Sequence, residues 1–259
     1  MQVDLHNHTP LCNHATGSID EYIQAAIAKG ISYFGFSDHA PMDFDPHYRM
    51  SFDAMADYEA DVKDAKKRYA DAITILLGYE VDFLPGHMDK RVLDAEVDYL
   101  IGSVHFLQGW GFDNPEFLAK WKEQDVNDVW KNYFETITQM VHSGYFDIVG
   151  HLDLIKVFNF LPTLSITDLA QEALHAIKEK EMVLEINGAG LRKPVAQPYP
   201  SFELLKEAKR LNIAITLSSD AHEPSQVGLF ASEITKMAYE AGYRECAYFI
   251  KKERYMTAL

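Results

Sequence analysis

The stretch Met1-Gln2-Val3-Asp4-Leu5-His6-Asn7-His8 opens the chain with a short segment that predicts a strand and ends in two histidines. In an extended segment residues i and i+2 point to the same side, so His6 and His8 can bind one cation together. One such pair is weak evidence for a metal site. Histidine or an acidic residue recurs, however, at the end of one predicted strand after another, and this repetition strongly favours metal-ligand chemistry.

Predicted strands alternate with amphipathic segments along the whole chain. Strands are expected near residues 2–6, 32–37, 73–82, 98–104, 146–150, 182–187 and 213–218, and helices near residues 19–29, 52–69, 126–143, 166–180 and 201–211. This alternation is typical of βαβ units with a parallel sheet. Because only a closed or nearly closed ring brings all strand ends to one point, we predict an α/β barrel with its metal site at the carboxyl ends of seven strands.

Length and charge restrict the possible functions. A chain of 259 residues is normal for one α/β barrel, so residues 1–259 are expected to form a single domain. A net charge of −15 lacks the basic face that nucleic-acid binding needs, so we expect no nucleic-acid partner. No apolar stretch reaches the length of a membrane span, and the first residues do not resemble a signal peptide, so we expect a cytoplasmic protein without a membrane partner. Neither composition nor pattern predicts the oligomeric state.

Two long connections follow ligand-bearing strands, at residues 40–51 and 106–122. Both begin at the carboxyl end of a predicted strand, where the candidate ligands also lie. Loops at that end of a barrel build its binding sites. We therefore expect these connections to form walls or lids of a substrate pocket.

Several motifs resemble the polymerase and histidinol phosphatase (PHP) superfamily. They are His6-Asn7-His8, His14, Ser37-Asp38-His39-Ala40-Pro41, Gly78-Tyr79-Glu80-Val81-Asp82, Ile101-Gly102-Ser103-Val104-His105-Phe106, Gly150-His151-Leu152-Asp153 and Ser219-Asp220-Ala221-His222. Segments similar to the histidinol-phosphate phosphatase branch are Arg49-Met50-Ser51, Gly109-Trp110, Glu185-Ile186-Asn187 and Gly190-Leu191-Arg192-Lys193-Pro194. The resemblance covers nearly the whole chain.

The resemblance implies a distorted (β/α)7 barrel that holds three divalent metal ions. The implied ligands are His6, His8, Glu80 and Asp220 for the first ion, Glu80, His105 and His151 for the second, and His14, His39 and His222 for the third. Imidazole-rich ligation favours zinc, iron or manganese over magnesium or calcium. Three divalent ions (+6) and two carboxylate ligands (−2) would leave a site of about +4, which suits a phosphate dianion.

The resemblance also implies the activity, a metal-dependent phosphomonoesterase that converts L-histidinol phosphate to L-histidinol and phosphate in histidine biosynthesis. Glu80 and Asp220 are the expected catalytic ligands. Asp38 is expected to orient a ligand imidazole, to cap a helix or to assist catalysis. The expected substrate contacts are Arg192, Lys193, Asn187, Asp82 and His47. Arginine suits the phosphate group because its planar guanidinium can donate two parallel hydrogen bonds.

Three alternatives stay open from the sequence. A PHP-type phosphoesterase could act on another small phosphorylated metabolite or a nucleotide. A metal-dependent amidohydrolase also begins with two histidines in this spacing, but such enzymes usually bridge their metals with a modified lysine, whereas here the bridging position is Glu80. A non-catalytic metal-binding protein is the third alternative, and the full set of ligands argues against it.

Overall fold

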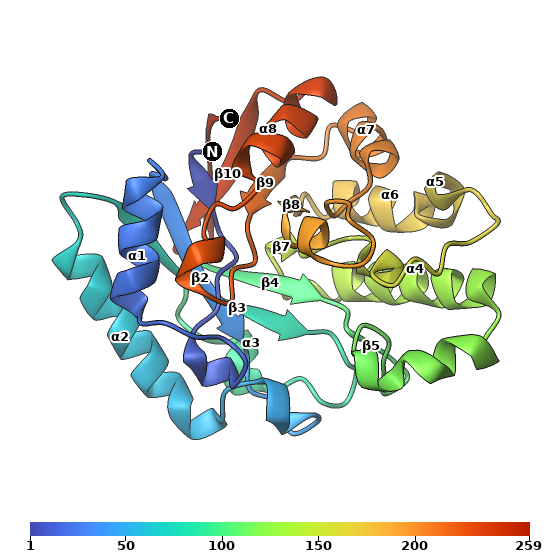
Figure 1. Cartoon of the computed structure of the whole chain (residues 1–259), viewed down its shortest axis with the longest axis horizontal. Coiled ribbons are helices and arrows are strands. Elements are labelled where there is room, and N and C mark those ends of the chain that lie inside the picture. The colour runs from blue at the N-terminus through green and yellow to red at the C-terminus, as the bar shows by residue number, and fades with distance from the viewer.

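Seven parallel strands form the centre of the structure, a computed structural model that describes residues 1–259 (Figure 1). In spatial order they are β1 (Val3–Asp4), β2 (Tyr33–His39), β3 (Thr74–Asp82), β4 (Tyr99–Ser103), β7 (Ile148–Val149), β8 (Val183–Asn187) and β9 (Ile215–Ser218). Backbone hydrogen bonds join the last strand to the first, from Leu5 N to Leu217 O at 3.2 Å and from His8 N to Ala221 O at 2.9 Å. The predicted α/β barrel of seven strands is confirmed, and it is nearly closed.

Helices surround the strands, as the alternating pattern predicts (Figure 1). They are α1 (Ile19–Ala28), α2 (Met55–Arg68), α3 (Lys90–Leu93), α4 (Val126–Ser143), α5 (Ile166–Leu169), α6 (Gln171–Glu179), α7 (Phe202–Arg210) and α8 (Ala231–Glu240). Helix α1 begins with a capping box, in which Ser18 and Glu21 satisfy each other's backbone N–H groups. Helix α4 ends at Gly144, whose φ of 75° suits glycine. None of these helices combines the length and the hydropathy that a membrane span requires.

The barrel interior and its helical layer share one apolar core of 70 buried residues. All five residues of β4 and all five of β8 are buried, because their two faces pack against the barrel interior and the helices. The polar groups at the strand ends are thus held on a rigid, fully packed frame.

A C-terminal hairpin covers the amino-terminal ends of the strands. It consists of β10 (Glu245–Ile250) and β11 (Glu253–Ala258), which pair in antiparallel register. Thr216 Oγ1 donates to Ala247 O at 2.9 Å, and Lys251 N donates to Asp98 Oδ1 at 3.0 Å. The opposite, carboxyl-terminal end of the barrel therefore stays available for a binding site.

The two long connections lie at that carboxyl-terminal end. The first contains the short 3-10 helix η2 (Pro46–Tyr48), and the second contains the hairpin β5 (Phe106–Leu107) and β6 (Trp110–Gly111) followed by the 3-10 helix η4 (Pro115–Glu123). Residues of both connections line one cavity of about 740 Å³, so the prediction that they form pocket walls is confirmed.

Candidate metal centre and substrate cavity

Glu80 lies at the centre of the predicted ligands, on β3 with only 1% of its surface exposed. Its Oε2 is 3.2 Å from His6 Nε2 and 2.9 Å from His39 Nδ1. Its Oε1 is 2.9 Å from His151 Nε2 and 3.6 Å from His105 Nε2. The two oxygens of one carboxylate thus face two different groups of imidazoles, which is the geometry that a bridging ligand requires.

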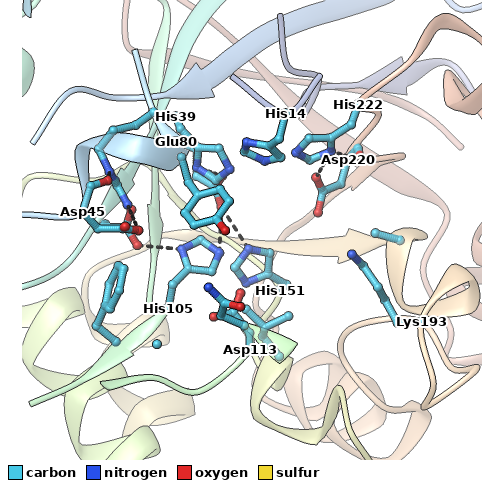
Figure 2. Close-up of a pocket in the computed structure, with 18 of the residues that line it drawn as sticks. His14, His39, Asp45, Glu80, His105, Asp113, His151, Lys193, Asp220 and His222 are labelled. Carbon is cyan, nitrogen blue, oxygen red and sulfur yellow. Dashed lines mark hydrogen bonds and ion pairs between the residues drawn. The ribbon is translucent and has the colours of Figure 1, made fainter. Parts of the chain in front are cut away.

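The nine predicted ligands come together at the carboxyl ends of the strands. Figure 2 labels seven of them, all except His6 and His8. Three sets of donor atoms, each with all its atoms within 4.8 Å of one another, are His6–His8–Glu80, Glu80–His105–His151 and His14–His39–His222. Asp220 joins the first set, because its Oδ1 is 3.2 Å from His8 Nε2. These sets match the three expected groups. The four remaining histidines, His47, His87, His142 and His175, are exposed on the surface.

Most of the candidate ligand imidazoles have an outer partner for Nδ1. His6 Nδ1 lies 2.7 Å from Glu185 Oε1, and His105 Nδ1 lies 2.6 Å from Asp82 Oδ1. His8 Nδ1 is 3.3 Å from Asp38 Oδ1, while the Nδ1 atoms of His14 and His222 face backbone carbonyls. Metal-bound histidines are usually oriented in this way. In these five rings the arrangement leaves Nε2 free to bind an ion.

The structure also offers a direct test of whether these residues fit metal ions. His6 Nε2 and His8 Nε2 are buried and have no hydrogen-bond partner, although buried polar nitrogens normally have one. His39 Nδ1 likewise makes no hydrogen bond, although Glu80 Oε2 lies 2.9 Å away. Divalent ions held between the imidazoles and the carboxylates would satisfy such atoms, so the residues present fit a metal centre.

Ionisation of the cluster follows from burial and from the crowded charges. Burial raises the pKa of the Glu80 carboxyl group, but the surrounding histidines outweigh it and hold the pKa well below its usual range. Burial lowers the pKa of His39 to about 4. Glu80 is therefore an anion and His39 a neutral imidazole near neutral pH, which are the forms that bind cations.

Asp220 follows β9 in a left-handed conformation with φ of 50°, which aspartate tolerates better than most residues. Asn187 Nδ2 donates to Asp220 Oδ2 at 3.1 Å. Both terminal nitrogens of Arg192 donate to backbone carbonyls, those of Ser219 at 2.9 Å and Asp220 at 2.7 Å. The position of the Asp220 carboxylate is thus determined by neighbours on β8 and on the loop that follows it.

A cavity of about 740 Å³ opens above the candidate metal ligands. Aromatic side chains from the two long connections form part of its wall, among them Phe44, Tyr48, Phe106 and Phe117. Arg192 and Lys193 also line it, and the Lys193 ammonium group makes no ion pair. The volume is appropriate for a small organic substrate.

The structure brings only some of the predicted substrate contacts to this cavity. Asp82 borders it, but its side chain is 1% exposed and its oxygens face His105 and Arg49 Nη1, the latter at 2.5 Å. Asn187 is fully buried and holds Asp220. His47 is exposed and lies outside the cavity lining.

Asp38 is fully buried and does not line the cavity. Its Oδ1 accepts from His39 N at 2.8 Å and faces His8, and its Oδ2 accepts from Thr9. Both carboxylate oxygens of Asp38 thus contact protein neighbours. Of the roles expected for Asp38, the orientation of a ligand imidazole is the one that this geometry favours.

Two further carboxylates were assigned no role from the sequence, although Glu185 lies in one of the segments that resemble the histidinol-phosphate phosphatase branch. Glu185, on β8, is 1% exposed and accepts from His151 N at 2.6 Å in addition to facing His6. Its position two residues before Asn187 in a predicted strand was a usable signal, because both side chains point to the same side. Asp113, in the second long connection, lines the cavity, and no periodic pattern marks such a loop residue.

Cys12, which could be a stray ligand from its place between His8 and His14, is buried beside the cluster. Its Sγ belongs to a fourth group of donor atoms with His8 and His222. The thiol donates to Thr9 O at 3.1 Å, so it has a partner within its own loop. This contact favours a packing role for the side chain.

Comparison with known proteins agrees with the geometry. The PHP domain family model matches residues 4–189. The chain is 39% identical to a probable histidinol-phosphatase from Deinococcus radiodurans, over 96% of this chain and 97% of the relative. It is 30% identical to a histidinol-phosphatase from Bacillus subtilis, over 94% and 98% of the two chains.

A solved structure shares the fold over nearly its whole length. The crystal structure of histidinol phosphate phosphatase from Lactococcus lactis, in complex with zinc, L-histidinol and phosphate, has a TM-score of 0.82. The sequence identity is 21%, and the match covers 98% of each chain. Since the family model spans most of this sequence and close relatives match it almost end to end, the chain belongs to the PHP domain family.

Proposed function

We propose that this protein is a histidinol-phosphatase, a phosphomonoesterase that hydrolyses L-histidinol phosphate to L-histidinol and phosphate. Relatives that carry this name match almost the whole chain at 39% and 30% identity. The structural observation that carries the proposal is the position of Glu80, whose two oxygens face separate histidine groups beneath a cavity of substrate size.

We further propose that the centre holds three divalent transition-metal ions. The first would be held by His6, His8, Glu80 and Asp220, the second by Glu80, His105 and His151, and the third by His14, His39 and His222. Histidine-rich ligation favours zinc, iron or manganese. The zinc in the Lactococcus lactis complex supports zinc as one candidate.

Bound ions would neutralise phosphate charge and make a water acidic enough to attack phosphorus near neutral pH. The residues of the chain prepare this chemistry by orientation. Glu185, Asp82 and Asp38 fix the imidazole rings so that Nε2 points inward. Because these groups are buried and already ordered, little reorganisation accompanies the reaction.

Lys193 and Arg192 are the candidate contacts to the phosphate group. Lys193 is an exposed cation without an ion pair, at the rim of the cavity. Arg192 uses two N–H groups to hold the loop of Asp220 and keeps others for a ligand. We expect both residues to act on the phosphate group that all phosphomonoesters share.

Phosphate release from L-histidinol phosphate, compared with a sugar phosphate, a nucleotide and an aryl phosphate, tests the proposal. The protein is first stripped with a chelator and then reloaded with zinc, manganese or iron. We expect activity only after reloading and the highest kcat/KM for L-histidinol phosphate. Equal efficiency towards all four compounds would contradict the substrate assignment, and no release from any of them would contradict the phosphatase assignment.

A further inference from the structure

The cavity has five carboxylate side chains in its lining: Asp45, Glu80, Asp82, Asp113 and Asp220. Glu80 and Asp220 face the imidazoles of the candidate metal centre. Asp82 and Asp45 both pair with Arg49, at 2.5 Å and 3.5 Å. Asp113 differs from the other four, because its carboxylate has neither an ion pair nor a hydrogen bond with another residue.

The backbone around Asp113 is firmly held. The preceding residue, Phe112, is fully buried, and its carbonyl accepts from Trp121 Nε1 at 3.0 Å. The following residue, Asn114, caps η4, because its side chain accepts from Glu116 N at 2.9 Å. The Asp113 carboxylate is thus placed at the cavity by an ordered segment on both sides.

Asp113 lies on one side of the candidate metal centre. In Figure 2 it is next to His105 and His151 and away from His14 and His222. Neither His105 nor His151 forms an ion pair with it. It is also absent from every group of donor atoms that could hold a metal ion. Its charge is therefore available to a molecule in the cavity.

A negative charge on Asp113, without a positive partner at the wall of the cavity, is unfavourable when no ligand is bound. Burial raises the pKa of Asp113, although the histidines nearby oppose that shift. A bound cation would remove this penalty. The aromatic rings of Phe106 and Phe117, which line the same cavity, would suit a flat cationic or neutral ring beside that charge.

We propose that Asp113 is the residue that recognises the cationic alcohol portion of the substrate, the ammonium or imidazolium group of L-histidinol. The inference rests on the proposed function, whose substrate carries a phosphate and a cationic group in one molecule. Lys193 and the candidate metal centre supply positive charge for the phosphate, while Asp113 supplies the one unpaired negative charge. Asp113 thus determines specificity and takes no part in breaking the phosphate ester.

Three phosphomonoesters distinguish this role from others: L-histidinol phosphate, phenethyl phosphate as a neutral alkyl ester, and p-nitrophenyl phosphate as an aryl ester with a good leaving group. For Asp113→Asn we expect kcat/KM to fall by about 10- to 100-fold for L-histidinol phosphate alone, as for the loss of one charged hydrogen bond. The other two substrates should change less than about threefold. Glu116→Gln, an exposed residue outside the cavity lining, is the matched control and should leave all three rates unchanged.

The alternatives give different patterns. Loss with both alkyl esters but not with the aryl ester would identify Asp113 as a proton donor to the leaving group and would overturn the proposal. An equal loss with all three esters, or no loss with any, would also overturn it.

Calorimetric binding of L-histidinol to the metal-loaded protein separates this inference from the proposed function, because it requires no turnover. We expect Asp113→Asn to weaken binding by at least about tenfold and Glu116→Gln to have no effect. Equal binding by the variant and the unchanged protein, or no binding by either, would defeat the role of Asp113. Binding that depends on Asp113 without hydrolysis of L-histidinol phosphate would defeat only the proposed function.

Discussion

Glu185 Oε1 lies 2.7 Å from His6 Nδ1, with both side chains buried beneath the cavity. The same carboxylate accepts from Ser218 Oγ at 2.6 Å and, through Oε2, from His151 N at 2.6 Å. Burial opposes the ionisation of Glu185, but His6 outweighs it and the pKa of the carboxyl group is lowered. The Glu185 carboxylate therefore orients the imidazole of His6, a ligand proposed for the first ion, and the backbone of His151, a ligand proposed for the second.

Glu185→Gln keeps the size of this side chain but removes its charge. We expect metal affinity and kcat/KM to fall by about 10- to 100-fold, as for the loss of other groups that orient metal ligands. Elemental analysis after dialysis against a weak chelator and steady-state kinetics measure both effects. Glu172→Gln, on the exposed side of α6, is the control. Full metal content and normal turnover in Glu185→Gln would show that His6 needs no anionic partner.

Glu80→Gln tests the proposed bridge. The amide removes the negative charge between the His6–His39 side and the His105–His151 side of the centre. We expect turnover to fall by at least about 10²-fold, together with a loss of bound metal from close to three ions per chain. His142→Ala, on the exposed face of α4, should leave both values within a few fold. Near-normal turnover with three ions still bound would mean that another group forms the bridge.

Asp82→Asn separates a structural role from a substrate contact. Asp82 is buried between His105 and Arg49, and Arg49 is itself 3% exposed. Without the carboxylate the guanidinium keeps a buried charge whose one remaining ion pair, with Asp45, is 3.5 Å long, so we expect the free energy of unfolding to fall by about 3–5 kcal/mol. Chemical denaturation measures this loss, with Asp43→Asn as an exposed control from the first long connection. A raised KM at unchanged stability would instead support a direct contact with substrate.

The sequence was sufficient to predict the barrel and the convergence of the candidate metal ligands at one end of it. Strand periodicity locates the strand ends, and in a ring of parallel strands those ends must meet, so His6 and His222 could be expected together although they lie far apart in the chain. The hairpin β10–β11 was not expected, because it follows the last repeated unit.

The substrate contacts were less accessible to prediction. Asp82 and Asn187 are polar residues at strand ends, as the candidate metal ligands are, yet both side chains bind protein neighbours and not the cavity. Which way such a side chain points depends on partners from other strands. Asp113 lies in an irregular segment whose path is determined by the packing of Phe112 and Trp121, and no spacing rule encodes that packing.

Metal binding should release protons even above neutral pH, because of His105. Burial alone would lower the pKa of this imidazole, but the carboxylates of Asp82 and Glu80 outweigh it and raise the pKa from 6.5 to about 10 in the metal-free protein. At pH 8 the ring therefore carries a proton that a metal ion must displace. We expect metal affinity to rise with pH up to about 10. Burial would also lower the pKa values of His6 and His8, but carboxylates such as Glu80 and Asp220 outweigh it and raise them well above the usual value, so these rings too release protons when metal binds. Calorimetry at pH 8 in two buffers of different ionisation enthalpy should therefore detect more than one released proton, and Asp82→Asn should reduce this number.

The same pKa determines how the stability of the metal-free protein depends on pH. A group whose pKa is raised by folding contributes stability that is fully present below its unfolded pKa and is lost as the pH rises through its folded pKa. For His105 that interval runs from 6.5 to about 10. The melting temperature of metal-free protein should therefore fall across this range, and the metal-loaded protein, whose imidazole is already neutral, should not show this part of the loss. Identical pH profiles for the two forms, with no proton released at pH 8, would mean that His105 is neutral before metal binds.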